Sequence, residues 1–140
     1  MFELHAQLAK DCAVVGDLSL CRVLMMNDRR FPWLVLVPRR EQIVETFQLT
    51  ALDQRLLWEE VNAVAAALAG DSRADKINIG ALGNIVPQLH VHVLARFQGD
   101  AAWPGPVWGS GGAEPFDDAA LAQRQREYVE LLQPLGLSAH

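Results

Sequence analysis

The sequence lacks the features of a membrane, exported or nucleic-acid-binding protein. No apolar run approaches the roughly 20 residues that a membrane-spanning helix needs. Residues 1–11 carry Glu3 and Asp11 and have no continuous apolar stretch, so they do not resemble an export signal. The formal net charge of -5 leaves no basic surplus for general nucleic-acid binding. We therefore expect a cytoplasmic protein with neither a membrane nor a nucleic acid as its partner.

Cysteine is also scarce, and the chain has no repeat or low-complexity tract. Cys12 and Cys21 are too few and too far apart for a CxxC zinc or redox motif. We expect two buried free thiols, although the sequence leaves a disulfide between them open. Hydrophobic residues make up 51% of the 140 residues, which suffices for the core of one compact domain. We expect residues 1–110 to form this domain, with a C-terminal loop and helix, residues 111–140, packed on it.

Short apolar runs bounded by turn residues recur along most of the chain. They predict strands at residues 12–15, 20–26, 33–37, 76–81 and 86–96. Apolar residues at helical spacing predict helices at the N-terminus, from Thr50 to Gly70, and over residues 119–132. The Gly- and Pro-rich segment 101–115 predicts an irregular loop. A helix placed between strand pairs favours an α+β domain with an antiparallel sheet.

The clearest chemistry lies in the segment Gln88-Leu89-His90-Val91-His92-Val93-Leu94. Side chains alternate along a strand, so Gln88, His90 and His92 share one face while the apolar residues between them face the core. Imidazole can attack phosphorus directly and can move protons near neutral pH. The same pair could bind a metal, although two histidines leave a zinc site short of ligands. Both histidines could also simply occupy a half-buried sheet face without a chemical role.

This segment resembles the signature of the histidine-triad (HIT) family, His-φ-His-φ-His-φ-φ with φ apolar, in which glutamine here replaces the first histidine. The preceding residues 83–87 are similar to the glycine–amide turn of that family. Asn27 and the strand at 33–37 are similar to its ribose-side strand pair. Trp103-Pro104 resembles a Trp-Pro pair that follows the motif in one branch.

The resemblance implies a HIT-like α+β fold, with helices and a five-stranded antiparallel sheet, in a homodimer. It implies that the middle histidine, His90, attacks the α-phosphorus of a nucleotide compound and forms a covalent nucleotidyl-histidine. Dinucleoside polyphosphates and nucleotide phosphoramidates are such compounds, and water or another acceptor then releases the nucleotide. The partner is thus a small nucleotide. No cofactor is required, with Mg²⁺ entering only alongside the substrate phosphates, and no metal site is expected.

The resemblance also implies roles around His90. His92 would bind phosphate and assist the leaving group. Asn84 would contact phosphate, and Asn27 would hold the ribose hydroxyls. The main-chain carbonyl of Gln88 would accept the hydrogen bond from His90, which any side chain at that position permits. Gln88 itself keeps a donor and an acceptor near the substrate.

Two more residues are substrate-binding candidates, and two departures leave an alternative open. Arg96 ends the motif strand and is a candidate phosphate ligand, while Trp103 lies in an irregular loop of the kind that often binds ligands. Gln88 and Trp33 stand where histidines of the family stand, so polar contacts around the phosphate are lost. The alternative is a catalytically impaired protein that binds nucleotides in a regulatory role.

Overall fold

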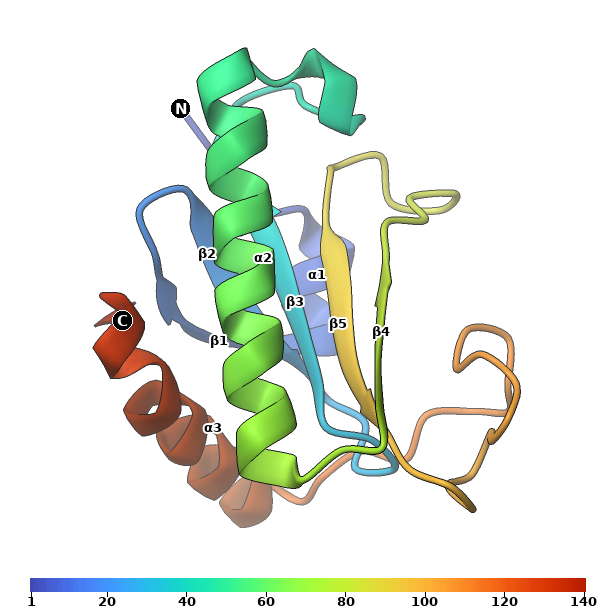
Figure 1. The fold of residues 1–140 in the computed structure, drawn as a ribbon. Coiled ribbons are helices and arrows are strands. Elements are labelled where there is room, and N and C mark those ends of the chain that lie inside the picture. The colour runs from blue at the N-terminus through green and yellow to red at the C-terminus, as the bar shows by residue number, and fades with distance from the viewer.

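An antiparallel sheet forms the centre of the computed structural model, which describes residues 1–140 (Figure 1). In chain order the elements are α1 (Ala6–Asp11), β1 (Cys12–Asp17), β2 (Cys21–Met26), β3 (Trp33–Pro38), α2 (Ala51–Ser72), β4 (Lys76–Gly80), β5 (Val91–Arg96), α3 (Asp118–Leu132) and β6 (Ser138–Ala139). Short 3-10 helices lie at Thr46–Gln48 and Gln133–Leu135. The strand order is β4-β5-β3-β2-β1-β6, and every pair is antiparallel.

The two faces of the sheet have different covers. In Figure 1, α2 crosses in front of the sheet with α3 beside it, whereas α1 lies behind the sheet. The core under α2 and α3 is a cluster of 21 buried residues, which includes Leu89, Val91 and Val93. The opposite face carries a smaller cluster of nine, which includes Leu8 of α1 and Trp33. The expected direction of the apolar motif residues, toward the main core, is confirmed.

Helix α2 forms as its sequence predicts, with a later end. The Thr50 side chain accepts a hydrogen bond from the Asp53 amide at 3.1 Å, which caps the first turn. Leu57, Val61, Val64 and Leu68 recur at helical spacing and are buried. The predicted end at Gly70 was wrong by two residues. The helix ends at Arg73, which takes a left-handed conformation (φ 55°). The Arg73 amide donates to the Ala69 carbonyl.

The prediction of five strands was wrong by one. The two-residue strand β6 pairs its Ala139 with Gly16 of β1. The predicted end of the first strand at Val15 was also wrong, because β1 continues through Gly16 and Asp17 after an irregularity between Val14 and Gly16. A Cβ at Gly16 would lie 2.5 Å from the carbonyl oxygen of Ser138, so the close approach of the tail requires a glycine there.

The motif strand is shorter than the predicted 86–96. Strand β5 begins at Val91, so Gln88 and His90 lie in the loop that precedes it. Pro87 has no amide to donate, and the Leu89 amide bonds to the Ile43 carbonyl rather than to a strand. In addition, β4 ends at Gly80, which pairs with His92, so no partner strand faces the residues before Val91 on that side.

Two further features bear on the expectations from composition. Both cysteines are free, as predicted, but only Cys21 is buried, whereas Cys12 is partly exposed. None of the helices combines the length and apolar character that crossing a membrane would require.

Candidate active site

His90 and His92 lie side by side on the face of the sheet that carries α1. His92 sits within β5, opposite Val35 of β3 and Gly80 of β4. The ring centroids of the two histidines are 5.0 Å apart at an angle of 72°. Each histidine is only 6% exposed. Strand β5 and the loop residue just before it therefore hold two imidazoles close together in a largely enclosed position, which restricts their orientations.

A main-chain hydrogen bond fixes the proton on His90. Its Nδ1 lies 2.6 Å from the carbonyl oxygen of Gln88. Because a carbonyl oxygen can only accept, Nδ1 carries the proton in the neutral ring, and Nε2 keeps its lone pair. His90 Nε2 has no hydrogen-bond partner in the chain and is not enclosed. This nitrogen is therefore free to act as a nucleophile.

His92 has the opposite arrangement. The indole Nε1 of Trp33 donates to His92 Nδ1 at 3.0 Å, so the proton of the neutral His92 ring is on Nε2. Burial, with a smaller contribution from the neighbouring His90, lowers the pKa of His92 to about 3. His92 is therefore neutral near pH 7, and its Nε2–H is a hydrogen-bond donor.

The side chain of Gln88 has a structural role that its main chain does not share. Its Oε1 accepts from the His5 amide and its Nε2 donates to the Glu3 carbonyl, both at 2.8 Å. These bonds hold the segment before α1 against the motif loop. The main chain of Gln88 serves His90, while the side chain anchors the N-terminal segment.

Gln88→His is therefore expected to preserve turnover. The carbonyl that orients His90 remains, so we expect a rate change of less than about 10-fold, far below the loss expected on removal of the nucleophile. Loss of the two bonds to residues 3–5 should instead lower the free energy of unfolding by about 1–2 kcal/mol. Steady-state kinetics and urea unfolding measure the two effects. A rate loss as large as that of His90→Ala would show that the Gln88 side chain is itself essential.

A small cavity of about 110 Å³ opens beside His90. It is lined by Val44, Glu45, Thr46, Ala81, Leu82, Gly83, Leu89 and His90. Gly83 has a φ of 67°, which lets the chain turn sharply at the cavity wall. The next residue, Asn84, is exposed and makes no hydrogen bond within the chain. The Asn84 amide is thus free to bind a ligand, next in the chain to a residue that lines the cavity.

Arg96 and Trp103 contact each other and the loop after β5, which does not favour the predicted role of Arg96 as a phosphate ligand. Arg96 is 2% exposed, and its guanidinium donates to both carboxylate oxygens of Asp100, to the Asn78 side chain and to the Gly105 carbonyl. The structure places Trp103 against this guanidinium, with a ring centroid 5.8 Å from its central carbon. Both residues therefore stabilise the loop after β5.

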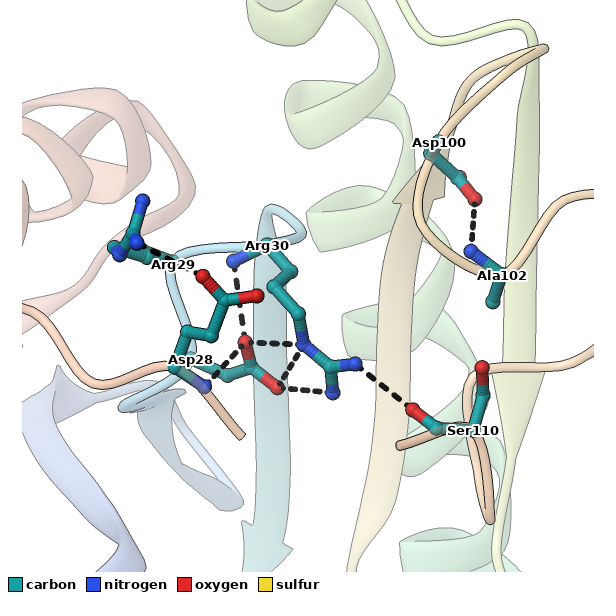
Figure 2. Close-up of polar contacts among 7 residues, drawn as sticks. Asp28, Arg29, Arg30, Asp100, Ala102 and Ser110 are labelled. Carbon is teal, nitrogen blue, oxygen red and sulfur yellow. Dashed lines mark hydrogen bonds and ion pairs between the residues drawn. The ribbon is translucent and has the colours of Figure 1, made fainter. Parts of the chain in front are cut away.

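Asn27 lies where the C-terminal segment crosses the β2–β3 turn. Its Oδ1 accepts from the Phe116 amide at 2.9 Å. The neighbouring Arg30 pairs with Asp28 and donates to the Ser110 carbonyl at 2.8 Å (Figure 2). Asn27 thus fixes the loop that leads into α3, and its amide nitrogen is the part left for a ligand.

Trp108 is a site residue that sequence reasoning did not select. Its ring centroid lies 5.5 Å from that of His92 in an edge-to-face arrangement. A Cβ at Gly80 would lie 2.9 Å from the Trp108 ring, so a glycine leaves room for it. The indole Nε1 of Trp108 is enclosed and has no acceptor. Two tryptophans in an irregular loop indicated a functional loop, but only the fold shows which of them reaches the histidines.

The geometry does not favour the metal alternative. No group of three or more histidine, cysteine, aspartate or glutamate side chains is placed to hold an ion. His92 Nδ1 and His90 Nδ1 are both engaged in hydrogen bonds, and two remaining Nε2 atoms leave a zinc site incomplete. The pair is better suited to a nucleophile and a donor.

The sequence model of the family described as "HIT domain" matches residues 7–99, which include both histidines, Trp33 and Gln88. The chain belongs to the HIT family. The matched region ends before Trp108, so the tryptophan beside His92 comes from the segment that follows the family domain.

Three solved structures of histidine-triad proteins are similar over nearly the whole chain. One from Sinorhizobium meliloti is 51% identical, with a TM-score of 0.88 and 96% of each chain covered. One from Bradyrhizobium japonicum is 44% identical (TM-score 0.87), with 95% of this chain and 96% of that chain covered. One from Marinobacter aquaeolei is 43% identical (TM-score 0.93), with 96% and 98% covered. No curated protein matches the chain.

Proposed function

We propose that this HIT protein is a nucleotide hydrolase or nucleotidyl transferase that works through a covalent nucleotidyl-His90 intermediate. The observation that carries the proposal is the 2.6 Å contact between His90 Nδ1 and the Gln88 carbonyl. It orients the ring and leaves the Nε2 lone pair available for attack. Membership of the HIT family supports the nucleotide as the ligand.

The proposed reaction has two steps. In the first, the Nε2 lone pair of His90 forms a bond to the α-phosphorus, and the leaving group departs with the electrons of its bond to phosphorus. The positive charge on the imidazole ring is stabilised by the Gln88 carbonyl. In the second, a water oxygen bonds to phosphorus, the N–P electrons return to Nε2, and the water proton passes to solvent. Transfer to another acceptor follows the same course with that acceptor in place of water.

Three polar side chains are proposed as substrate contacts. The Nε2–H of His92 would donate to a phosphate oxygen, and the exposed Asn84 amide would do the same. The amide nitrogen of Asn27 would reach the ribose hydroxyls. No resident cofactor is required for these steps, and a magnesium ion would enter with the substrate phosphates.

Cleavage in water enriched in ¹⁸O tests the position of attack. We expect a dinucleoside polyphosphate to yield a nucleoside monophosphate that carries the label. Label only in the polyphosphate product would place the attack at another phosphorus and contradict the proposal. Tight nucleotide binding without any turnover would instead favour the alternative of a regulatory nucleotide-binding protein.

We also propose that the protein works as a homodimer joined at β4. This strand is an edge of the sheet, and exposed apolar side chains lie on it and on the loop after it, namely Ile79, Leu82 and Ile85. A second copy related by a two-fold axis could pair its own β4 with this edge and cover these side chains. Cytoplasmic location is a further expectation of the account.

Light scattering at micromolar concentration should give twice the 15.5 kDa mass of the chain. Ile79→Lys places a charge at the centre of the proposed edge and should shift the protein to monomer, because the lysine would be buried without a partner. A monomer mass for the wild-type protein at all concentrations would contradict the dimer.

A further inference from the structure

His92 is bracketed by two tryptophans from distant parts of the chain. Trp33 lies at the start of β3, with its ring centroid 5.6 Å from that of His92. Trp108 lies in the loop between β5 and α3, at 5.5 Å. Trp33 supplies the hydrogen bond to Nδ1, and Trp108 covers the ring without bonding to it. Together with His90 they leave His92 only 6% exposed.

The loop that carries Trp108 is fixed at both ends. Before Trp108, the buried Arg96 donates to the Gly105 carbonyl at 2.9 Å. After it, Arg30 donates to the Ser110 carbonyl at 2.8 Å (Figure 2). In the same loop, Asp100 accepts from the Ala102 amide. These bonds hold the position of the indole, so the cover over His92 is a built part of the site.

The two tryptophans leave His92 with a single ring proton, on Nε2, and disfavour the addition of a second one. To become a general acid, the ring would have to carry a second proton at Nδ1, the atom that accepts from Trp33. Such a proton would meet the indole N–H head-on, inside an apolar cover that disfavours charge. Among its neighbours Trp33, Trp108, Gly80 and His90, only His90 has an ionisable side chain, and a positive charge on it would oppose a second charge on His92.

No other group near the histidines is placed to supply a proton to a leaving group. The Nδ1 proton of His90 is engaged by the Gln88 carbonyl, and its Nε2 is the attacking atom. Glu45 lines the cavity beside His90 but forms no hydrogen bond with either histidine. The leaving group must therefore depart with its electron pair and without a proton from the enzyme.

We propose that Trp33 and Trp108 hold His92 as a fixed donor, and that the site thereby selects substrates whose leaving group departs as a stable anion. Phosphoanhydrides meet this requirement, because a phosphate or polyphosphate leaves as an anion. Phosphoramidates do not, because an amine must gain a proton as the P–N bond breaks. The inference rests on the proposed function, since it names the leaving group of the same reaction.

Two matched substrates test the selection by leaving group. The wild-type protein should cleave diadenosine tetraphosphate with a kcat/KM about 10²-fold or more above that for an adenosine phosphoramidate of an alkylamine, a difference of the size that a general acid contributes. Trp33→Phe keeps an aromatic ring but removes the N–H. We expect this variant to lower the preference at least about 10-fold and to cleave the phosphoramidate faster as pH falls from 8 to 5, because His92 can then be protonated. Trp58→Phe, in an exposed position on α2, is the matched control and should keep the wild-type ratio.

Long-range ¹H–¹⁵N NMR spectra of the histidine rings give a readout that does not depend on activity. In the wild type, His92 should show a protonated Nε2 and an unprotonated Nδ1, with no titration between pH 5 and 8. In the Trp33→Phe variant, His92 should titrate in this range. A His92 that titrates in the wild type would overturn the inference. Equal cleavage of both substrate classes would overturn it while leaving the proposed function intact. Failure to cleave either substrate class, with no nucleotide bound covalently to His90, would overturn the proposed function and this inference together.

Discussion

His90→Ala is expected to lower kcat/KM by about 10⁴-fold or more while the fold stays intact, because the substitution removes the attacking atom. His92 cannot replace it, since the lone pair on its Nδ1 is engaged by Trp33 and its Nε2 carries a proton. Alanine at this position leaves only a small cavity next to an existing one. The Gln88 carbonyl oxygen can accept a hydrogen bond from water in place of the lost ring.

The loss at His90 is measured by steady-state turnover under matched conditions, with circular dichroism and thermal unfolding as checks on the fold. His140→Ala is the matched control, because His140 lies at the far end of the sheet, where it contacts Asp17, and should leave turnover unchanged. Wild-type turnover in His90→Ala would remove His90 from the role of nucleophile.

Arg96→Met is expected to lower the free energy of unfolding by about 3–5 kcal/mol, the cost of breaking a buried ion pair from one side. The Arg96 side chain is 2% exposed and that of Asp100 is 7% exposed, and their contact is 2.8 Å. Methionine fills a similar volume but leaves Asn78 Oδ1 and the Gly105 carbonyl without the Arg96 donor, and it leaves the Asp100 carboxylate with backbone amides as its only partners. The loop that positions Trp108 should loosen as a consequence.

The effect of Arg96 should depend on pH. The hydrogen bonds from Arg96 hold the pKa of Asp100 well below its ordinary value of 3.8. A lowered pKa in the folded state stabilises the protein above the ordinary value, and that stabilisation is lost as pH falls through the lowered pKa. The difference between the wild type and Arg96→Met should therefore be largest near pH 7 and shrink toward pH 2.

Urea unfolding at several pH values measures this difference. Arg29→Met is the control, because Arg29 forms an exposed pair with Glu114 that should contribute less than about 1 kcal/mol. A loss of less than about 1 kcal/mol in Arg96→Met at pH 7 would contradict the structural role assigned to Arg96.

Local patterns predicted most of the elements. Strands β2 and β3, helix α2 and helix α3 begin and end within two residues of their predicted bounds, because apolar periodicity and capping residues act within each segment. The proximity of His90 and His92 also follows from a local pattern, since both lie within three residues of the chain. Their opposite proton positions do not, because the partners are a local carbonyl in one case and Trp33, 59 residues away, in the other.

Long-range contacts account for what the sequence did not predict. A charged residue at a strand end resembles a phosphate ligand, and nothing local indicates that Arg96 meets Asn78, Asp100 and Gly105 in the interior. The start of β5 depends on where β4 ends, and the role of Trp108 depends on how the loop returns over the sheet. Such features require the assembled fold.

Trapping the covalent intermediate tests the central claim most directly. The protein is mixed with a dinucleoside polyphosphate, quenched rapidly under alkaline conditions in which a phosphohistidine bond survives, and weighed by mass spectrometry. We predict a mass gain of one nucleoside monophosphate, located on the peptide that contains His90 and absent from His90→Ala. Normal turnover by His90→Ala, with no adduct on the wild type, would contradict the account and indicate direct attack by water.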